Sequence, residues 1–350
     1  MSERRSAERD GGPSLRVRLA VLGTVALLAV VGAGGYVWRV RHAQVSLEAA
    51  APPVATGGAL EPVRGQPHLV FRSTALGAQY GRVAVVPLSA PDGPRTFAPV
   101  SCERVHATTD RAVCLSAERG IVTTYSARLL DAGWQPIQDL PLTGVPSRTR
   151  LSADGSLVAT TSFVAGDSYA NPGQFSTRTV VTRAGGEVVG DIEQFKLFVD
   201  GRSVTAIDRN MWGVTFADGD RFYATAASGG RTWLVEGSLA RRTVTALHED
   251  AECPSLSPDG TRVAVKKRGD LPPGRWRLAV YDLRDGRQTL LSETRSVDDQ
   301  VEWLDDDTVL YGLPRADAAS ATSDVWAVPA DGGGQPRVLV ADAWSPAVVR

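Results

Sequence analysis

The stretch that decides the fold begins Cys253-Pro-Ser-Leu-Ser-Pro-Asp-Gly-Thr-Arg-Val-Ala-Val-Lys-Lys-Arg268. A polar loop follows, then Trp276-Arg-Leu-Ala-Val-Tyr-Asp-Leu283, a short turn and Gln288-Thr-Leu-Leu291. Asp-Gly pairs at 259–260 and 285–286 mark turns, because Gly adopts positive φ without steric cost and Asp hydrogen-bonds to nearby backbone. The stretch therefore predicts four short strands. Such a unit cannot bury its own faces, which implies neighbours of the same kind.

Apolar residues alternate with others in the second and third of these strands. Val263 and Val265 lie two apart in one strand, and Leu278 and Val280 lie two apart in the next. Period-two alternation is typical of a strand with one face in the core and the other in solvent. We therefore expect these strands to be half-buried.

The same pattern recurs along the chain. Close copies begin at Ser147, Trp212 and Gln300, and a weaker copy begins at Ser101. Together with the unit at Cys253 they make five units, and self-similarity of this kind is typical of a propeller.

The two ends of the chain supply a sixth unit. After the fifth unit comes one more first-strand pattern, Trp344-Ser-Pro-Ala-Val-Val349. Strands two, three and four are matched near the start by His68-Leu-Val-Phe-Arg72, Arg82-Val-Ala-Val-Val-Pro87 and Arg95-Thr-Phe97. Joining them closes the ring and leaves no open sheet edge. We predict an all-β fold, a six-bladed β-propeller whose last blade combines one C-terminal strand with three N-terminal ones.

One spacing between units is irregular. The unit at Ser147 is followed about 65 residues later by the unit at Trp212. Insertions around Asp167 to Gln174 and around Asp191 to Arg209 would account for the difference. An open two-sheet sandwich of similar strands is the alternative architecture.

The repeated pattern Leu-Ser-Pro/Ala-Asp-Gly-x-x-Val-Ala, at Leu256 and Leu151, resembles the propeller repeat of TolB-like proteins. Trp344-Ser-Pro fits the start of a first strand in the same repeat. The resemblance covers residues 66–350. It implies a six-bladed propeller of a kind that occurs in binding proteins and beside peptidase domains. We expect a membrane anchor in place of the leader and N-terminal domain of TolB, and in this the chain resembles the anchored TolB-like proteins of high-GC Gram-positive, actinobacterial species.

A membrane segment precedes the propeller. Leu19 to Trp38 is a run of 20 uncharged, mostly apolar residues, about the length of a spanning helix. Five arginines precede the run, so the positive-inside rule predicts a cytoplasmic tail at 1–18 and export of everything after the helix. We predict an Ala/Pro/Gly-rich stalk at 39–66 and the propeller at 67–350. The alternative is a cleaved signal peptide and secretion, although signal peptides usually have a shorter apolar region.

Two of the three cysteines are placed to form a disulfide. Cys102 and Cys114 fall on the first two strands of one blade, nearly opposite each other across a turn. Adjacent antiparallel strands bring Cβ atoms close enough for the bond, and export favours oxidation. Two free thiols, or a metal or redox pair, are the alternatives. Cys253 is predicted to be a single buried thiol.

Acidic residues gather where a binding face is expected. In a propeller, the loops from the fourth strand of one blade to the first strand of the next meet around the central channel. These loops carry Glu249, Asp250, Glu252, Asp298, Asp299 and Asp342. Converging carboxylates would favour a cation, a basic peptide or Ca²⁺, whereas ordinary solvated loop acids are the alternative. Asp154, Asp218 and Asp305 belong to turns on the opposite face.

The sequence contains no recognisable catalytic group. The four histidines form no Ser/His/Asp or metal-spaced set, and no Gly-x-Ser-x-Gly motif is present. The net charge of -1 gives no attraction to nucleic acid. We predict a membrane-anchored extracytoplasmic module without cofactor or catalysis, which binds a protein, peptide or cell-envelope component. The alternative is a hydrolase or lyase at the acidic face, with Asp250 and Asp298 as general bases.

Overall fold

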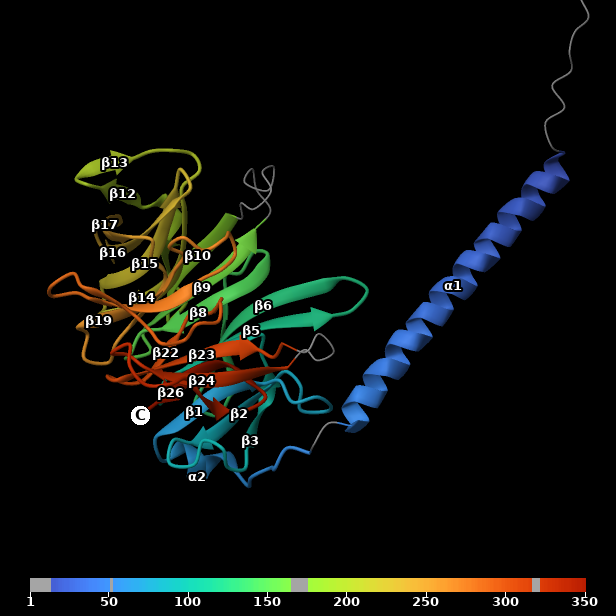
Figure 1. The fold of residues 1–350 in the computed structure, drawn as a ribbon, viewed down its shortest axis with the longest axis horizontal. Helices are drawn as coiled ribbons and strands as arrows, with labels where there is room; N and C mark the ends of the chain where they lie inside the picture. The colour runs from blue at the N-terminus through green and yellow to red at the C-terminus, as the bar shows by residue number, and fades with distance from the viewer. Residues whose placement is uncertain (1–13, 51–52, 165–175, 317–321) are drawn as a thin grey trace, which may run out of the picture. The chain divides into compact units, whose positions relative to one another are not determined.

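The computed structural model describes residues 14–50, 53–164, 176–316 and 322–350. The chain forms two compact units, Met1–Pro52 and Pro53–Arg350. The first unit contains the helix α1 (Leu15–Ala50), and the second contains the strands of the described residues (Figure 1).

The helix α1 is long and apolar enough to cross a membrane over Leu15–Ala43. A helix of this kind serves as a membrane anchor or as the apolar part of a signal peptide. The helix continues beyond Trp38, where the apolar run ends, because neither Pro nor Gly occurs between Trp38 and Pro52.

The strands of the second unit form six sheets, the blades of a propeller. Blade 1 contains β4 (Arg104–Ala107), β5 (Arg111–Arg119), β6 (Thr123–Asp131) and β7 (Pro136–Leu140). Blade 2 contains β8 (Val145–Leu151), β9 (Leu157–Val164), β10 (Ser176–Arg183) and β11 (Val188–Asp191). Blade 3 contains β14 (Asn210–Phe216), β15 (Arg221–Ser228), β16 (Arg231–Ser238) and β17 (Thr243–Glu249).

The remaining blades include the one that joins the two ends. Blade 4 contains β18 (Glu252–Leu256), β19 (Arg262–Lys267), β20 (Arg277–Asp282) and β21 (Gln288–Leu290). Blade 5 contains β22 (Glu302–Asp305), β23 (Thr308–Pro314), β24 (Ser323–Pro329) and β25 (Arg337–Val340). The closing blade contains β26 (Ala343–Val349), β1 (His68–Ser73), β2 (Arg82–Pro87) and β3 (Thr96–Ser101).

The closing blade confirms the predicted seam. β26 pairs antiparallel with β1, with His68 opposite Val349 and Ser73 opposite Ala343. Each first strand contacts the first strand of the next blade, from β4 round to β26 and back to β4. The ring is therefore closed, which excludes the open sandwich.

The middle strands of the blades are buried on both faces, so the prediction of half-buried strands was wrong. In β19, Val263 and Val265 pack with residues of blade 3, while Ala264 packs with residues of blade 5. Alternate residues of one strand therefore serve two different interfaces, because each blade lies between two others. Even Lys266 on this strand is buried.

The insertion predicted at Asp191 to Arg209 forms extra structure at the outer edge of blade 3. A 3₁₀ turn, η2 (Ile192–Gln194), precedes a hairpin of β12 (Lys196–Val199) and β13 (Arg202–Val204). β12 pairs in parallel with β17, which extends the sheet to six strands. The other predicted insertion, Asp167 to Gln174, lies outside the described residues.

Part of the expected stalk lies against the propeller. The short helix α2 (Leu60–Arg64) packs Leu60 and Val63 against the core of the closing blade and blade 1. The Gly57 N–H also donates to the Arg95 carbonyl at 2.7 Å. These residues therefore belong structurally to the second unit.

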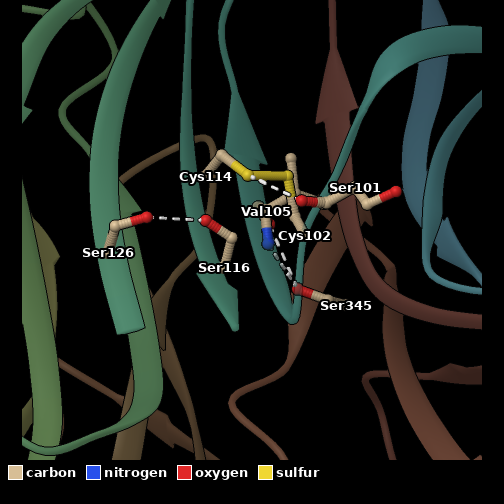
Figure 2. Close-up of a disulfide and its surroundings, with 7 residues drawn as sticks. All are labelled: Ser101, Cys102, Val105, Cys114, Ser116, Ser126 and Ser345. Atoms are coloured by element: carbon tan, nitrogen blue, oxygen red, sulfur yellow. Dashed lines mark hydrogen bonds between the residues drawn. A yellow bond between two sulfur atoms is a disulfide. The ribbon is translucent and has the colours of Figure 1, made fainter. Parts of the chain in front are cut away.

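The predicted disulfide joins Cys102 to Cys114, with Cα atoms 5.4 Å apart (Figure 2). Cys102 precedes β4, and Cys114 on β5 is opposite Val105, so the two are offset along the strands. Beside the disulfide, the Ser345 hydroxyl bonds both backbone groups of Val105, at 3.2 and 3.1 Å, which ties β26 to β4 (Figure 2). Cys253 is a free, buried thiol, as predicted.

Candidate functional site

The first strands of the six blades surround a central channel with two different ends. We call the end with the loops from fourth to first strands the loop face, and the end with the turns from first to second strands the turn face. The predicted acidic residues lie toward the loop face. Asp154, Asp218 and Asp305 lie on the turn face, where each accepts a backbone N–H of its own turn, as predicted.

Each of the six predicted acids has a partner. The pairs are Glu249 with Arg231, Asp250 with Lys267, Glu252 with the Trp276 indole, Asp298 with Lys266, Asp299 with Arg104, and Asp342 with Arg315. Five of these partners are cations, so much of the negative charge expected at this face is neutralised locally.

Three of the six acids share one pocket. Glu249, Asp250 and Glu252 line a cavity of about 340 Å³ between blades 3 and 4. Burial raises the pKa of Glu252, an effect that the Lys266 charge partly offsets. Asp299 instead faces the channel, and Asp342 pairs with Arg315 at the closing blade.

Lys266 lies between Asp298 and Trp276, the residue that binds Glu252 of this pocket. Its Nζ lies 2.7 Å from Asp298 Oδ1 and 4.1 Å from the centre of the Trp276 ring. The Arg148 guanidinium also reaches Asp298, at 3.3 Å. Burial tends to raise the pKa of Asp298, but the charges of Lys266 and Arg148 outweigh it and the pKa is lowered. This carboxylate is therefore held ionised between two cations.

Asp299 closes the neighbouring part of the channel. Its side chain is 1 % exposed, receives Arg104 at 2.8 Å and accepts the Gly312 N–H at 3.0 Å. The Arg104 guanidinium also lies 4.9 Å from the Trp344 ring centre, which adds a cation–π contact. Blades 1, 5 and the closing blade meet through Arg104, Asp299 and Trp344.

Sequence reasoning missed the buried cations that the acids bind. Arg104, Arg148 and Arg150 lie on first strands, and Lys266 lies on a second strand. Arg148-Thr-Arg150 places two charges at period two on an innermost strand, and this spacing is the signal that could have identified them. Between the three arginines and Gln300, the channel keeps a space of only about 20 Å³, room for about one water molecule.

The turn face opens into a larger cavity, which we call the funnel. Its volume is about 570 Å³, within the range of small-ligand sites, and every blade contributes to its lining. The apolar part of the wall includes Leu151, Phe216, Leu256 and Val348. Thr108, Thr109 and Ser257 supply hydroxyl groups.

Three ionisable side chains lie together in the funnel lining. Arg150 and Glu302 form an ion pair, and His106 Nε2 lies 3.7 Å from the same Glu302 oxygen. His106 Nδ1 accepts the Leu151 N–H at 3.2 Å, so the proton of the neutral ring is on Nε2. Burial lowers the pKa of His106, and the bond to Glu302 only partly opposes this. Glu302 remains ionised, because Arg150 outweighs the effect of burial on its pKa.

Within the described ranges, no three His, Cys, Asp or Glu side chains are grouped so that they could hold a metal ion. The arrangement is therefore a channel closed by ion pairs toward one face and open as a funnel toward the other.

No protein-family model and no curated protein sequence matches the chain. Among solved structures, TolB from Acinetobacter baumannii is similar, with a TM-score of 0.57 over 81% of this chain and 67% of that chain, at 16% identity. The fold is TolB-like. At this identity the likeness concerns the fold alone.

Two enzymes with lower scores are also similar. A puromycin-hydrolyzing peptidase of Mycobacterium tuberculosis has a TM-score of 0.44 and 15% identity, covering 84% of this chain and 56% of that chain. An oligogalacturonate lyase in complex with manganese has a TM-score of 0.45 and 13% identity, covering 72% and 73%.

Proposed function

We propose that this TolB-like propeller is a non-catalytic binding module, anchored in the cell membrane and exported, which receives a segment of a protein, peptide or envelope component in the funnel. The funnel carries the proposal. It is built from all six blades, has the volume of a ligand site, and combines apolar walls with hydroxyl and charged groups. Such a mixed wall suits a peptide segment, which presents both apolar and hydrogen-bonding groups.

The pairing of the charged groups supports binding without catalysis. A general base needs a free lone pair near the substrate. In the funnel lining, Glu302 is engaged by Arg150 and His106, and His106 Nδ1 is engaged by the Leu151 N–H. Arg150, Glu302 and His106 therefore hold one another in place. The ligand would be recognised by the shape of the funnel, by its hydroxyl groups and by the atoms of the ion pair that face the cavity.

The location rests on α1 and on the disulfide. The arginines before the apolar run favour an N-terminus in the cytoplasm and a propeller outside it. The Cys102–Cys114 bond is consistent with an oxidising compartment. Secretion after signal cleavage is the alternative, and the size of the membrane-bound protein in cells distinguishes the two.

Photocrosslinking in intact cells tests the funnel. A photoreactive amino acid replaces Thr109, an exposed residue of the funnel wall, in the full chain. Ala153→Trp, at another exposed wall position, should obstruct the funnel and reduce the crosslinked product several-fold.

Ala240→Trp is the matched control. Ala240 is exposed in a turn on the same face of blade 3 and is not part of the funnel wall. The control should leave the crosslinks unchanged. Equal products from both tryptophan variants, or none from the original chain, would contradict funnel binding.

One observation favours a hydrolase or lyase as the second candidate. Glu252, with its raised pKa, lies beside Asp250 in the pocket of about 340 Å³. A carboxyl group with a raised pKa beside an ionised one is the arrangement that acid–base catalysis uses. Alanine at Asp250, Glu252, Asp298 and Asp299 would abolish turnover of a substrate under this hypothesis. Under the hypothesis of an acidic binding face, the same variants would weaken capture of a partner.

A further inference from the structure

The β5–β6 hairpin is longer than the sheet to which it belongs. β4 pairs with β5 only as far as Leu115, and β7 pairs with β6 only from Ala127 on. β5 and β6 continue to pair with each other out to Arg119 and Thr123. Residues 116–126 therefore form a two-stranded ribbon that projects from the loop face (Figure 1).

The end of this ribbon is apolar and exposed. Ile121 and Val122 form the tip, with relative exposures of 107% and 73%. Tyr125 on the ribbon and Tyr80 in the β1–β2 connection are each more than a third exposed. Arg119, also on the ribbon, forms an ion pair with Glu103 at 2.9 Å.

This order of side chains matches a bilayer interface better than a protein interface. Apolar side chains favour the acyl region, whereas Tyr and Arg favour the headgroup level. Two apolar residues on a convex tip offer far less area than the roughly 800 Å² per partner of a stable protein interface. The exposed, charged Glu118 and Arg119 protect the ribbon edge against an added strand.

The membrane anchor keeps such a tip near lipid. About 25 residues separate the end of the membrane-spanning part of α1 at Ala43 from β1 at His68. Even fully extended, a chain of this length spans at most about 85 Å. A tether raises the local concentration of the tip at the bilayer, so an insertion that is weak alone becomes populated.

We propose that the tip of the ribbon, Ile121 and Val122, inserts into the lipid leaflet on the propeller side of the membrane that α1 spans. The inference rests on the anchor part of the proposed function and is independent of the funnel. The ribbon projects from the loop face and the funnel opens at the turn face. Contact between the ribbon and the lipid would therefore leave the funnel facing away from the membrane.

Fluorescence quenching tests the contact. The full chain is reconstituted into vesicles of phosphatidylcholine and phosphatidylglycerol, with an environment-sensitive fluorescent amino acid in place of Val122. Lipids with a nitroxide near the headgroup should quench this probe several-fold more than the same probe in place of Ile207. Ile207 is the matched control because it is 98% exposed and lies in the connection that enters β14 at the loop face. Ile121→Ser should reduce the quenching at position 122 several-fold.

The outcomes separate the two hypotheses. Retention of the chain on vesicles after an alkaline wash, with equal or no quenching at positions 122 and 207, overturns ribbon insertion and leaves the anchor intact. Loss of the chain in the wash overturns the anchor and the insertion together. A ribbon made for a protein partner gives no quenching in pure lipid and likewise overturns the proposal.

Discussion

The two ends of the channel are built from the same six first strands and differ in what fills them. Toward the loop face, long cations cross between blades and meet carboxylates, as Arg104 meets Asp299 and Arg148 meets Asp298. At the turn face, short turns such as the one at Asp259 bond to their own backbone and leave the funnel open. In this propeller, closure of the channel therefore depends on the reach of side chains and not on the arrangement of strands.

The largest effect on stability is expected from removing β26, a first strand that extends from one end of the channel to the other. Deletion of residues 344–350 removes most of β26, including the contacts of Trp344 with Arg104 and of Ser345 with Val105. The deletion leaves the edge of β1 unpaired and removes buried residues of β26. Calorimetry should therefore show no cooperative unfolding transition at the Tm of the original chain. Arg350→Ala is the control and should melt as the original chain does, because Arg350 is exposed. A truncated chain with an unchanged Tm would contradict the seam.

The next effect compares the carboxylates at the two ends. Asp299→Ala leaves Arg104 without its carboxylate and should cost about 3–5 kcal/mol of unfolding free energy. Glu302→Ala should cost less, because Arg150 keeps bonds to the Val301 carbonyl and the Ser255 hydroxyl. Urea denaturation measures both values.

The Asp139→Ala variant, which removes an exposed ion pair with Arg128, is the control for these two and should have no measurable effect. If Glu302→Ala lowers the unfolding free energy more than Asp299→Ala does, the channel is more tightly closed to water near the funnel than at the loop face. This result would contradict the difference between the two ends described above.

The disulfide should contribute a smaller amount at the loop-face end. Cys102→Ala together with Cys114→Ala should lower the unfolding free energy by about 2–4 kcal/mol, because the bond restricts the unfolded chain. Reduction of the original chain should lower its stability by a similar amount. A mass map of the unreduced protein without a peptide joining Cys102 to Cys114 would remove the basis of this prediction.

The smallest expected effect is a pH dependence of the unfolding free energy that arises from His106 at the turn-face end. His106 has a lowered pKa in the folded state, so the unfolded state binds its proton more readily. The stability contribution of His106 should therefore fall as pH drops below about 6.5, by at most about 1.4 kcal/mol per pH unit. Burial raises the pKa of Glu193 to about 7, which acts in the opposite direction over the range from about 7 down to about 4.5.

Because the two groups oppose each other, the useful measurement is the difference between the original chain and His106→Gln. Urea denaturation at about pH 7.5 and about pH 5.5 should give a smaller loss of stability on acidification for the variant. An identical loss in both chains would show that the environment of His106 does not disfavour its charged form.

Local sequence patterns predicted the fold well and the site less well. The turns at Asp154 and Asp259, the disulfide partners and the pairing of β26 with β1 depend on short-range patterns and on repeat counting, and all are confirmed. Four of the six acids lie in the expected loops, and Glu249 and Glu252 lie at the strand ends that border one of them, but the partners of these acids were not predicted. Lys266 is about 30 residues from Asp298, and Arg148 is 150 residues away, so no local pattern connects them.

The sequence by itself determined the number of blades, the seam, the disulfide and a helix able to span a membrane, because each is a property of neighbouring residues or of their repetition. The tertiary structure alone decided that the strands are buried on both faces, that cations close one end of the channel, and that the other end holds a funnel. These features arise when blades pack on each other. Packing brings together side chains whose separation in the sequence carries no information about their distance in space.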